Sequence, residues 1–359
     1  MTSHSQTLPK ILYGEKWIEE VLDEIVGDQV LICSSKSVII KEEISQLISE
    51  LRYQKMLILD EISPNPTDKE IDHFAGVVRN FKPTTILAIG GGSVIDVAKV
   101  LGVLLSSPTP ILIHDFLLSG MLMARKNKLI AIPTTCGTGS EATPFATIWT
   151  KNGTGKMSIE SSVLRPEVCV LVGSLSSSAP LSQIFFSGLD AMSHCIETLW
   201  NRNLDAQSEK FANDALTTIL RIFPNIVNGY GTQMEWQEMQ EAAMFAGCAI
   251  SKNHTAIAHS ISYPLTAYLG VPHGLACSFS IPAIWKNLSV ETRLLTGNEK
   301  LISEAVEMIE SMGVMSHLKQ YTEISQLVAL VPEMLKSNRA RNFIVNYTED
   351  ELNKLLGQM

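Results

Sequence analysis

Residues 85–99 read TILAIGGGSVIDVAK, in which a short apolar run leads through three glycines into a helical pattern. A run that is apolar on nearly every position is typical of a strand covered on both faces in a parallel sheet. The glycines let the backbone approach an oxyanion, and the first N–H groups of the next helix supply donors to it. The stretch therefore predicts a strand–turn–helix unit that holds a phosphate, although its spacing matches neither GxGxxG nor the P-loop.

Similar runs recur on both sides of this stretch, separated by helical patterns and turns. They are Val30–Cys33, Met56–Leu59, Leu129–Ile132 and Val168–Val172. From about residue 182 the pattern changes to long helical segments, namely Ile184–Asn201, Asp205–Ile226, Trp236–Lys252, Leu301–Met312, Ile324–Leu335 and Glu349–Leu356. We expect an α/β domain with a largely parallel sheet over residues 1–178 and an all-α domain over residues 179–359. The Ser-rich segment Gly173–Pro180 has the composition of a connector.

Composition limits the partners. The chain has 359 residues, is 45% hydrophobic, and carries 28 Lys and Arg against 37 Asp and Glu, a net charge of −9. It can bury sizeable cores but has no excess of positive charge to hold nucleic acid or an anionic membrane. No apolar run reaches the roughly 18 residues of a membrane span, the start lacks the apolar core of a signal peptide, and the six cysteines form no CxxC pair. We expect a cytoplasmic protein with reduced thiols.

A second polar loop, PTTCGTGSE at Pro133–Glu141, also follows a predicted strand. Its hydroxyls, on Thr134, Thr135, Thr138 and Ser140, suit a ribose, a nicotinamide amide or a second phosphate. A plain surface loop remains the alternative.

A dispersed set of metal-binding side chains lies in the helical half. Asp190 and His194 are four residues apart, so both lie on one helix face, and His259 and His273 follow. One carboxylate and three imidazoles are a ligand set for Fe²⁺ or Zn²⁺. Two core histidines and an unrelated Asp–His pair remain the alternative.

Together these motifs resemble the iron-containing (group III) alcohol dehydrogenases, whose architecture is shared with dehydroquinate synthase. The chain contains the family patterns PNPT, GGGSxxDxAK, PTTxGTGSE and GxDAxxHxxE in the order in which the family has them. Two histidines fourteen residues apart follow, the second of them in PHG. The matching segments are Pro64–Thr67, Gly90–Lys99, Pro133–Glu141, Gly188–Glu197, and His259 with His273.

The resemblance implies a metal-dependent oxidoreductase with a Rossmann-like dinucleotide-binding domain, a helical metal domain, NAD(H) or NADP(H), and Fe²⁺ or Zn²⁺. It implies a small aldehyde or alcohol as substrate and a homo-oligomer, commonly a dimer. The implied metal ligands are Asp190, His194, His259 and His273. The implied cofactor-binding residues are Ser35, Asn65, Gly91, Gly92, Ser93, Asp96, Thr134, Thr135, Thr138 and Ser140.

Two positions depart from the family. Many members end the first cofactor strand with a carboxylate that binds the adenosine ribose, whereas Ser35 stands here beside Lys36, so the choice between NAD and NADP stays open. Many members carry a second histidine where this chain has Tyr263. The Tyr263 hydroxyl is a candidate to deliver the catalytic proton, with an ordered water, the cofactor ribose or a merely packed aromatic as alternatives.

Within the family, the segment HSISYPLTAYLGVPHGLACS resembles the phosphonoacetaldehyde reductases, which form 2-hydroxyethylphosphonate. A dianionic substrate needs nearby cations. The candidates are Lys156, Arg202, Lys252 and His254, with Arg339 and Arg341 near the end of the chain. Alternatives are a broad alcohol dehydrogenase for short alcohols or diols, a lyase resembling dehydroquinate synthase, and a non-catalytic binding protein.

Overall fold

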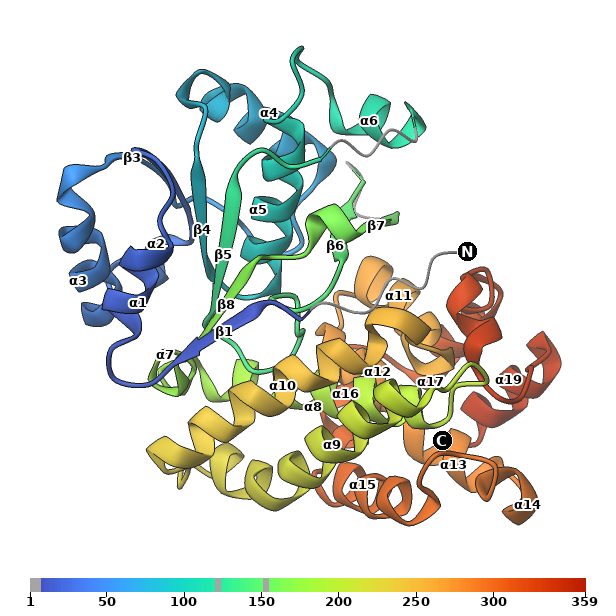
Figure 1. Ribbon diagram of the computed structural model, residues 1–359. Helices are drawn as coiled ribbons and strands as arrows, with labels where there is room; N and C mark the ends of the chain where they lie inside the picture. The colour runs from blue at the N-terminus through green and yellow to red at the C-terminus, as the bar shows by residue number, and fades with distance from the viewer. Residues whose placement is uncertain (1–7, 120–123, 151–154) are drawn as a thin grey trace. The chain divides into compact units, whose positions relative to one another are not determined.

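The structure is a computed structural model that describes residues 8–119, 124–150 and 155–359 (Figure 1). The chain forms two compact units. The first contains the described residues of 1–134, 140–152 and 157–175, and the second those of 135–139, 153–156 and 176–359.

The first unit contains a six-stranded sheet in which every pair of neighbours is parallel. In spatial order its strands are β1 (Lys10–Tyr13), β8 (Val168–Leu171), β5 (Lys128–Pro133), β4 (Thr85–Gly90), β2 (Gln29–Cys33) and β3 (Lys55–Leu59). All five predicted runs are strands of this sheet, which confirms the expected parallel α/β architecture. The first strand was not among the predicted runs, because KILY is short and alternates in burial.

Helices cover both faces of this sheet (Figure 1). Leu31 and Cys33 of β2 lie in one apolar cluster, which includes α4 (Asp68–Val78) and α5 (Gly92–Leu104), while Val30 and Ile32 lie in another, which includes α1 (Trp17–Glu24) and α3 (Glu42–Glu50). Burial on both sides explains why the strands are apolar at consecutive positions. The remaining short elements of this half are α2 (Lys36–Ile39), α6 (Ile113–Ser119), η1 (Leu51–Tyr53), η2 (Arg79–Phe81) and η3 (Ser162–Leu164).

A small second sheet of β6 (Phe145–Trp149) and β7 (Lys156–Glu160) was not predicted. Both strands are only five residues long, and polar side chains interrupt their apolar pattern. The predicted connector is also more ordered than expected, because Gly173–Ser177 forms the short helix α7.

The second unit is helical, as expected. Its long helices are α8 (Leu181–Leu199), α9 (Ala206–Val227), α10 (Gln233–Asn253), α11 (Ile257–Leu269) and α15 (Glu299–Ser311). Its shorter elements are α12 (His273–Ser278), α13 (Ile281–Asn287), α14 (Val290–Arg293), α16 (Val314–Leu318), α17 (Ile324–Ala329), α18 (Val331–Met334), η4 (Asn338–Asn342) and α19 (Glu349–Gly357). The single helix expected over 324–335 is split, with Pro332 at the start of the second piece, where its missing N–H costs nothing. Among the described residues, no helix is long and apolar enough to cross a membrane.

Candidate active site

Asp190 and His194 occupy successive turns of α8, as their spacing predicts. The His194 Nε2 atom is 3.6 Å from the Asp190 Oδ1 atom, and both residues are only 4% exposed. The helix is held tightly at this point, because a Cβ on Gly188 would lie 2.1 Å from the Phe223 ring of α9. This close approach explains the glycine two residues before the aspartate.

His259 near the start of α11 and His273 at the start of α12 converge on the same carboxylate. Their Nε2 atoms lie 3.5 Å and 3.9 Å from the Asp190 Oδ1 atom. Gly274 allows this, since a Cβ there would lie 1.8 Å from the backbone oxygen of Phe186 in α8. The structure thus brings together the four residues expected to bind metal.

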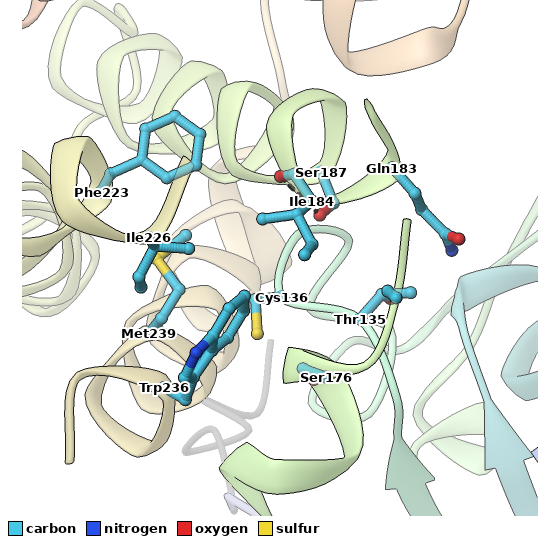
Figure 2. Close-up of a pocket in the computed structure, with 11 residues that line it drawn as sticks. Thr135, Cys136, Ser176, Gln183, Ile184, Ser187, Phe223, Ile226, Trp236 and Met239 are labelled. Carbon is cyan, nitrogen blue, oxygen red and sulfur yellow. Dashed lines mark hydrogen bonds between the residues drawn. The ribbon is translucent and has the colours of Figure 1, made fainter. Parts of the chain in front are cut away.

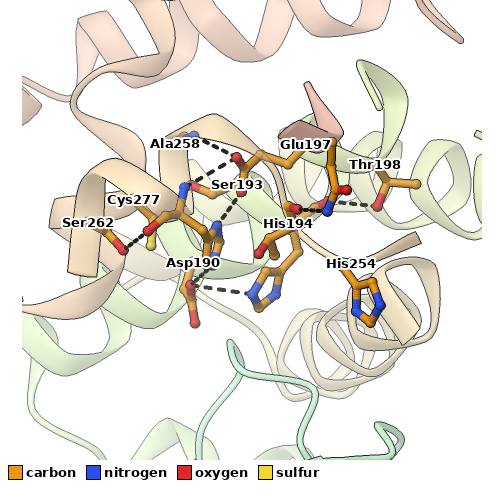
Figure 3. Close-up of polar contacts among 12 residues, drawn as sticks. Asp190, Ser193, His194, Glu197, Thr198, His254, Ala258, Ser262 and Cys277 are labelled. Carbon is orange, nitrogen blue, oxygen red and sulfur yellow. Dashed lines mark hydrogen bonds and ion pairs between the residues drawn. The ribbon is translucent and has the colours of Figure 1, made fainter. Parts of the chain in front are cut away.

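The donor atoms of this cluster lack ordinary partners. Asp190 Oδ1 and His259 Nε2 are buried without a hydrogen-bond partner among the residues that the structure describes, and they face each other as an ion pair at 3.5 Å (Figure 3). Buried polar atoms without partners are rare because each costs free energy. A carboxylate and imidazoles in this arrangement fit a divalent cation such as Fe²⁺ or Zn²⁺.

The pKa shifts of Asp190, His194 and His273 agree with binding of a divalent cation. Burial raises the pKa of Asp190, but the surrounding imidazoles outweigh it and hold that pKa well below its ordinary value. Burial lowers the pKa of His194 to about 4, and burial together with the charge of Lys156 lowers the pKa of His273 well below its ordinary value. An ionised carboxylate beside neutral imidazoles is the protonation state that binds a metal, and the pKa shifts of these three residues favour it. His259 differs, because burial lowers its pKa but the interactions with Cys277 and Glu197 outweigh burial and raise that pKa well above its ordinary value.

Glu197 completes the cluster, although it was not among the predicted site residues. Its carboxylate accepts a bond from the His259 Nδ1 atom and accepts the backbone N–H groups of Ala258 and His259 at 2.7 and 3.2 Å (Figure 3). A bond at Nδ1 fixes the ring so that its Nε2 lone pair faces Asp190. The signal was present in the sequence, because Glu197 is the last residue of the matched GxDAxxHxxE pattern.

Tyr263 and Lys156 lie beside the histidines. The Lys156 Nζ atom sits 4.1 Å from the centre of the Tyr263 ring, and that ring stacks on His273 with 6.5 Å between centroids. Burial raises the pKa of the Tyr263 hydroxyl, but the charge of Lys156, together with smaller contributions from His259, Arg339 and Thr255, outweighs burial, so the pKa lies below its ordinary value. Lys156 is therefore a predicted substrate cation that lies beside the predicted metal ligands, and Arg339 is another whose charge acts on Tyr263.

Three other predicted substrate cations make different contacts. Arg202 donates to the Phe343 carbonyl at 2.7 and 2.9 Å and to Asn346 at 2.8 Å, and the exposed Lys252 pairs with Asp205 at 3.6 Å. His254 is half-buried, and its φ of 62° and ψ of 174° belong to a region that residues other than glycine rarely adopt.

In the first unit, the glycine-rich turn has the predicted form. Gly91 caps α5 and accepts the N–H groups of Val94 and Ile95, while Gly91, Gly92 and Ser93 are half-buried at its N-terminus. The Ser93 hydroxyl accepts the N–H of Asn65 at 3.2 Å, and Asn65 adopts a left-handed φ of 57°. The glycine-rich turn follows β4 and Asn65 follows β3, on either side of β2 in the sheet, so both lie beyond the carboxyl edge, where open α/β sheets bind ligands.

Ser35 follows β2, the strand that lies between β4 and β3 in the sheet. It caps α2 and forms an isolated bridge with Glu61, whose carboxylate accepts a bond from Lys36 at 3.0 Å. The positive charge beside Ser35 is therefore offset by a carboxylate that the sequence analysis did not consider.

Asp96 and Ser140 have protein partners instead of open polar atoms. Asp96 accepts bonds from the Ser140 hydroxyl and from the N–H of Thr147, the latter at 2.8 Å. Lys99 is fully buried and donates to Ser140, Thr143 and Phe145 at 2.6 to 3.2 Å. The two predicted cofactor residues are thus built into a network around a buried ammonium.

The loop 135–139 packs against helices of the second unit. A Cβ on Gly137 would lie 2.5 Å from the Ser187 backbone oxygen, and Gly139, with a φ of 60°, touches Gly247 of α10. Thr135 and Cys136 line a small, largely apolar pocket with Trp236, Met239 and other side chains of α8 to α10 (Figure 2). Both glycines are therefore explained by close backbone approach.

Thr134 and Thr138 were also predicted to bind cofactor. The Thr134 N–H bonds to the Gly90 carbonyl at 3.1 Å, which ties the end of β5 to the glycine-rich turn. Thr138 lies between the two packed glycines of the loop.

Two family models match most of the chain. One, described as "Iron-containing alcohol dehydrogenase", matches residues 9–172. The other, described as "Fe-containing alcohol dehydrogenase family, C-terminal", matches residues 184–356.

Curated relatives include a bifunctional aldehyde-alcohol dehydrogenase of Escherichia coli (strain K12), 29% identical over 75% of this chain and 32% of that protein. A phosphonoacetaldehyde reductase of Streptomyces viridochromogenes is 30% identical over 60% of this chain and 56% of that protein. Both matches span less than two thirds of the relative's own length.

Among solved structures, the sulfoacetaldehyde reductase of Bifidobacterium kashiwanohense in complex with NAD⁺ aligns with a TM-score of 0.83. The alignment covers 100% of this chain and 99% of that one at 22% identity. At this identity the likeness shows a common fold.

Proposed function

The chain belongs to the iron-containing alcohol dehydrogenase family, and we propose that it reduces a small anionic aldehyde, with phosphonoacetaldehyde as favoured substrate, to the primary alcohol. The observation that carries the choice of an anionic substrate is the Lys156 ammonium 4.1 Å from the Tyr263 ring, beside His273. We further propose a cytoplasmic homo-oligomer.

The metal would be held by Asp190, His194, His259 and His273, with Glu197 orienting His259. When bound, a divalent cation supplies polarisation of the aldehyde oxygen and a nicotinamide cofactor supplies the hydride. The side chains themselves fix the donor atoms in a buried site, where charge interactions are strong.

Lys156 would bind the anionic group of the substrate, and its position over Tyr263 would set the distance between that group and the reacting carbonyl. His254, Arg202 and Lys252 remain further substrate candidates, and Arg202 and Lys252 also have the structural partners described above. The Tyr263 hydroxyl is the candidate to donate a proton to the product oxygen, because it lies in the same group of side chains.

In the first unit, Gly91, Gly92, Ser93 and Asn65 would contact the cofactor phosphates, with Thr134 nearby on the next strand. Ser35 would face the adenosine ribose. Thr135 and Thr138 remain candidates along the cofactor, and Asp96 and Ser140 would act through the Lys99 network. The cofactor is NAD or NADP.

The second candidate is a broad dehydrogenase for short alcohols or diols. It is favoured by the relationship to aldehyde-alcohol dehydrogenases. The lyase alternative loses its basis, because both family models describe alcohol dehydrogenases.

The test measures NADH and NADPH oxidation by the purified, Fe²⁺-reconstituted protein with phosphonoacetaldehyde, propanal, lactaldehyde and glyceraldehyde. Lys156→Ala should raise KM for phosphonoacetaldehyde about 10- to 100-fold, since a hydrogen bond to a charged group contributes about 1.5–3 kcal/mol, and should leave propanal nearly unchanged.

Lys210→Ala is the matched control, because that lysine is exposed and pairs with Asp214 in its own helix. Equal effects of Lys156→Ala on both aldehydes would contradict the anionic substrate. If no aldehyde oxidises either cofactor, the oxidoreductase proposal itself is wrong.

A further inference from the structure

Cys277 lies in α12 four residues after His273, so both side chains are on one face of the helix, one turn apart. The Cys277 Sγ atom is 3.6 Å from the His273 Nε2 atom and 3.7 Å from its Nδ1 atom. A thiol hydrogen bond would point at one nitrogen along its lone pair. Nearly equal distances to both nitrogens therefore place the sulfur against the ring instead of in line with either atom.

The sulfur also belongs to a compact group of donor atoms. One ligand atom from each of Asp190, His259, His273 and Cys277 lies within 4.8 Å of the other three. Two of these residues, Asp190 and His259, are only 4% and 3% exposed, and their Oδ1 and Nε2 atoms are buried without a hydrogen-bond partner in the described part of the chain. This group includes Cys277 in place of His194, which approaches Asp190 from the neighbouring turn of α8.

We propose that Cys277 is a sulfur ligand of the metal centre and that it makes the centre favour Zn²⁺ over Fe²⁺ more strongly than a site of oxygen and nitrogen donors alone. The proposal rests on the metal centre described under the proposed function. On binding, a metal–sulfur bond forms, the S–H bond breaks, and its proton passes to solvent, with no change in oxidation state. Thiolate is the softest donor in the group, and soft donors select metals such as Zn²⁺.

The alternative is a thiol that only packs, since a free cysteine behaves as a small hydrophobic residue. The two cases differ in their optical spectrum, because thiolate bound to Co²⁺ gives an intense near-ultraviolet charge-transfer band that imidazole and carboxylate do not give. Co²⁺ is therefore the probe, added to the metal-free full-length protein.

We expect this band in the wild-type protein, saturating at one equivalent of Co²⁺. Cys277→Ser should lose the band but keep the weaker visible bands of bound Co²⁺, because the carboxylate and imidazoles remain. Cys33→Ala is the matched control, since Cys33 is an equally buried thiol in the first unit, and it should keep the band. Competition of Zn²⁺ against Fe²⁺ should show a selectivity for Zn²⁺ at least tenfold lower in Cys277→Ser.

A wild-type protein that binds Co²⁺ without the band overturns the proposal, whether or not the variant folds. So does a Cys277→Ser variant that keeps the band. The spectrum is independent of turnover, so a protein that shows the band but reduces no aldehyde would overturn the proposed function and leave the sulfur ligand standing.

Discussion

Each unit contains a buried charged cluster, and the two clusters differ in how their polar atoms are satisfied. In the first unit, the fully buried Lys99 ammonium donates to four oxygen atoms and lies 3.8 Å from the Asp96 carboxylate. In the second unit, Asp190 and His259 are equally buried, yet each leaves a polar atom without a hydrogen bond in the described structure.

This contrast separates a structural network from a binding site. Buried polar groups normally find partners, so a cluster whose groups already bond to one another needs no ligand to satisfy them. An unsatisfied cluster costs stability unless something binds there. Substitutions should therefore damage stability in the first cluster and metal binding in the second.

The largest effect should come from Asp190→Ala. Losing the carboxylate shared by three imidazoles should lower kcat/KM for the aldehyde by about 10³-fold or more, since metal polarisation supplies several kcal/mol. The variant should also lose the rise in Tm that added Fe²⁺ or Zn²⁺ gives to the wild type. A variant whose Tm still rises with metal would show that Asp190 is not a ligand.

Next, Lys99→Met should lower the free energy of unfolding by about 3–5 kcal/mol, because it leaves a carboxylate and several acceptors buried without their cation. Urea unfolding measures this, and metal content of the folded fraction should stay at the wild-type level. Lys126→Met, at an exposed lysine of the same unit, is the control. Loss of metal from folded Lys99→Met would break the contrast between the clusters.

Glu197→Gln should weaken metal binding about 10- to 100-fold, as expected for a residue that orients a metal-binding histidine. A chelator competition measures the affinity. Glu310→Gln is the control, because that carboxylate is exposed and pairs with Lys286. An unchanged affinity would mean that the backbone alone orients His259.

The smallest effect should come from Ser140→Ala. This change should lower the free energy of unfolding by about 1–2 kcal/mol, because it removes one hydroxyl that bonds to Lys99 and Asp96. KM for NADH and NADPH should stay within about twofold of the wild-type value if Ser140 acts only through that network. A raised KM at unchanged stability would instead make Ser140 a direct cofactor contact.

Much of the fold follows from local pattern. Strands such as β4 are apolar at consecutive positions because helices cover both faces, and that pattern predicts a parallel sheet. The split between α17 and α18 and the helix α11, which contains Pro264, were not predicted, because a proline within a helix weakens the periodic signal, whereas α9 was predicted across Pro224. The β6–β7 sheet carries too little apolar pattern to be recognised.

The site was predictable where spacing along one helix sets geometry, as for Asp190 and His194. His259 and His273 needed the resemblance, because their convergence depends on how α11 and α12 pack against α8. Glu197 and Cys277 were not among the predicted site residues, even though each lies one helical turn from a predicted ligand. Ser140 and Asp96 show the converse limit, since sequence cannot tell whether a polar side chain faces a ligand or a buried lysine.

The packed glycines of loop 135–139 restrict how this chain can be dissected. One family model ends at residue 172 and the other begins at residue 184, so a helical fragment that begins between these residues would be an obvious choice for expression. Such a fragment would lack the loop, and the surface around Gly247 and Ser187 that it covers would be exposed to solvent together with Trp236 and Met239. A usable truncation would have to supply the loop as well, for example by grafting residues 135–139 through a designed linker, because the sequence boundary is not a folding boundary.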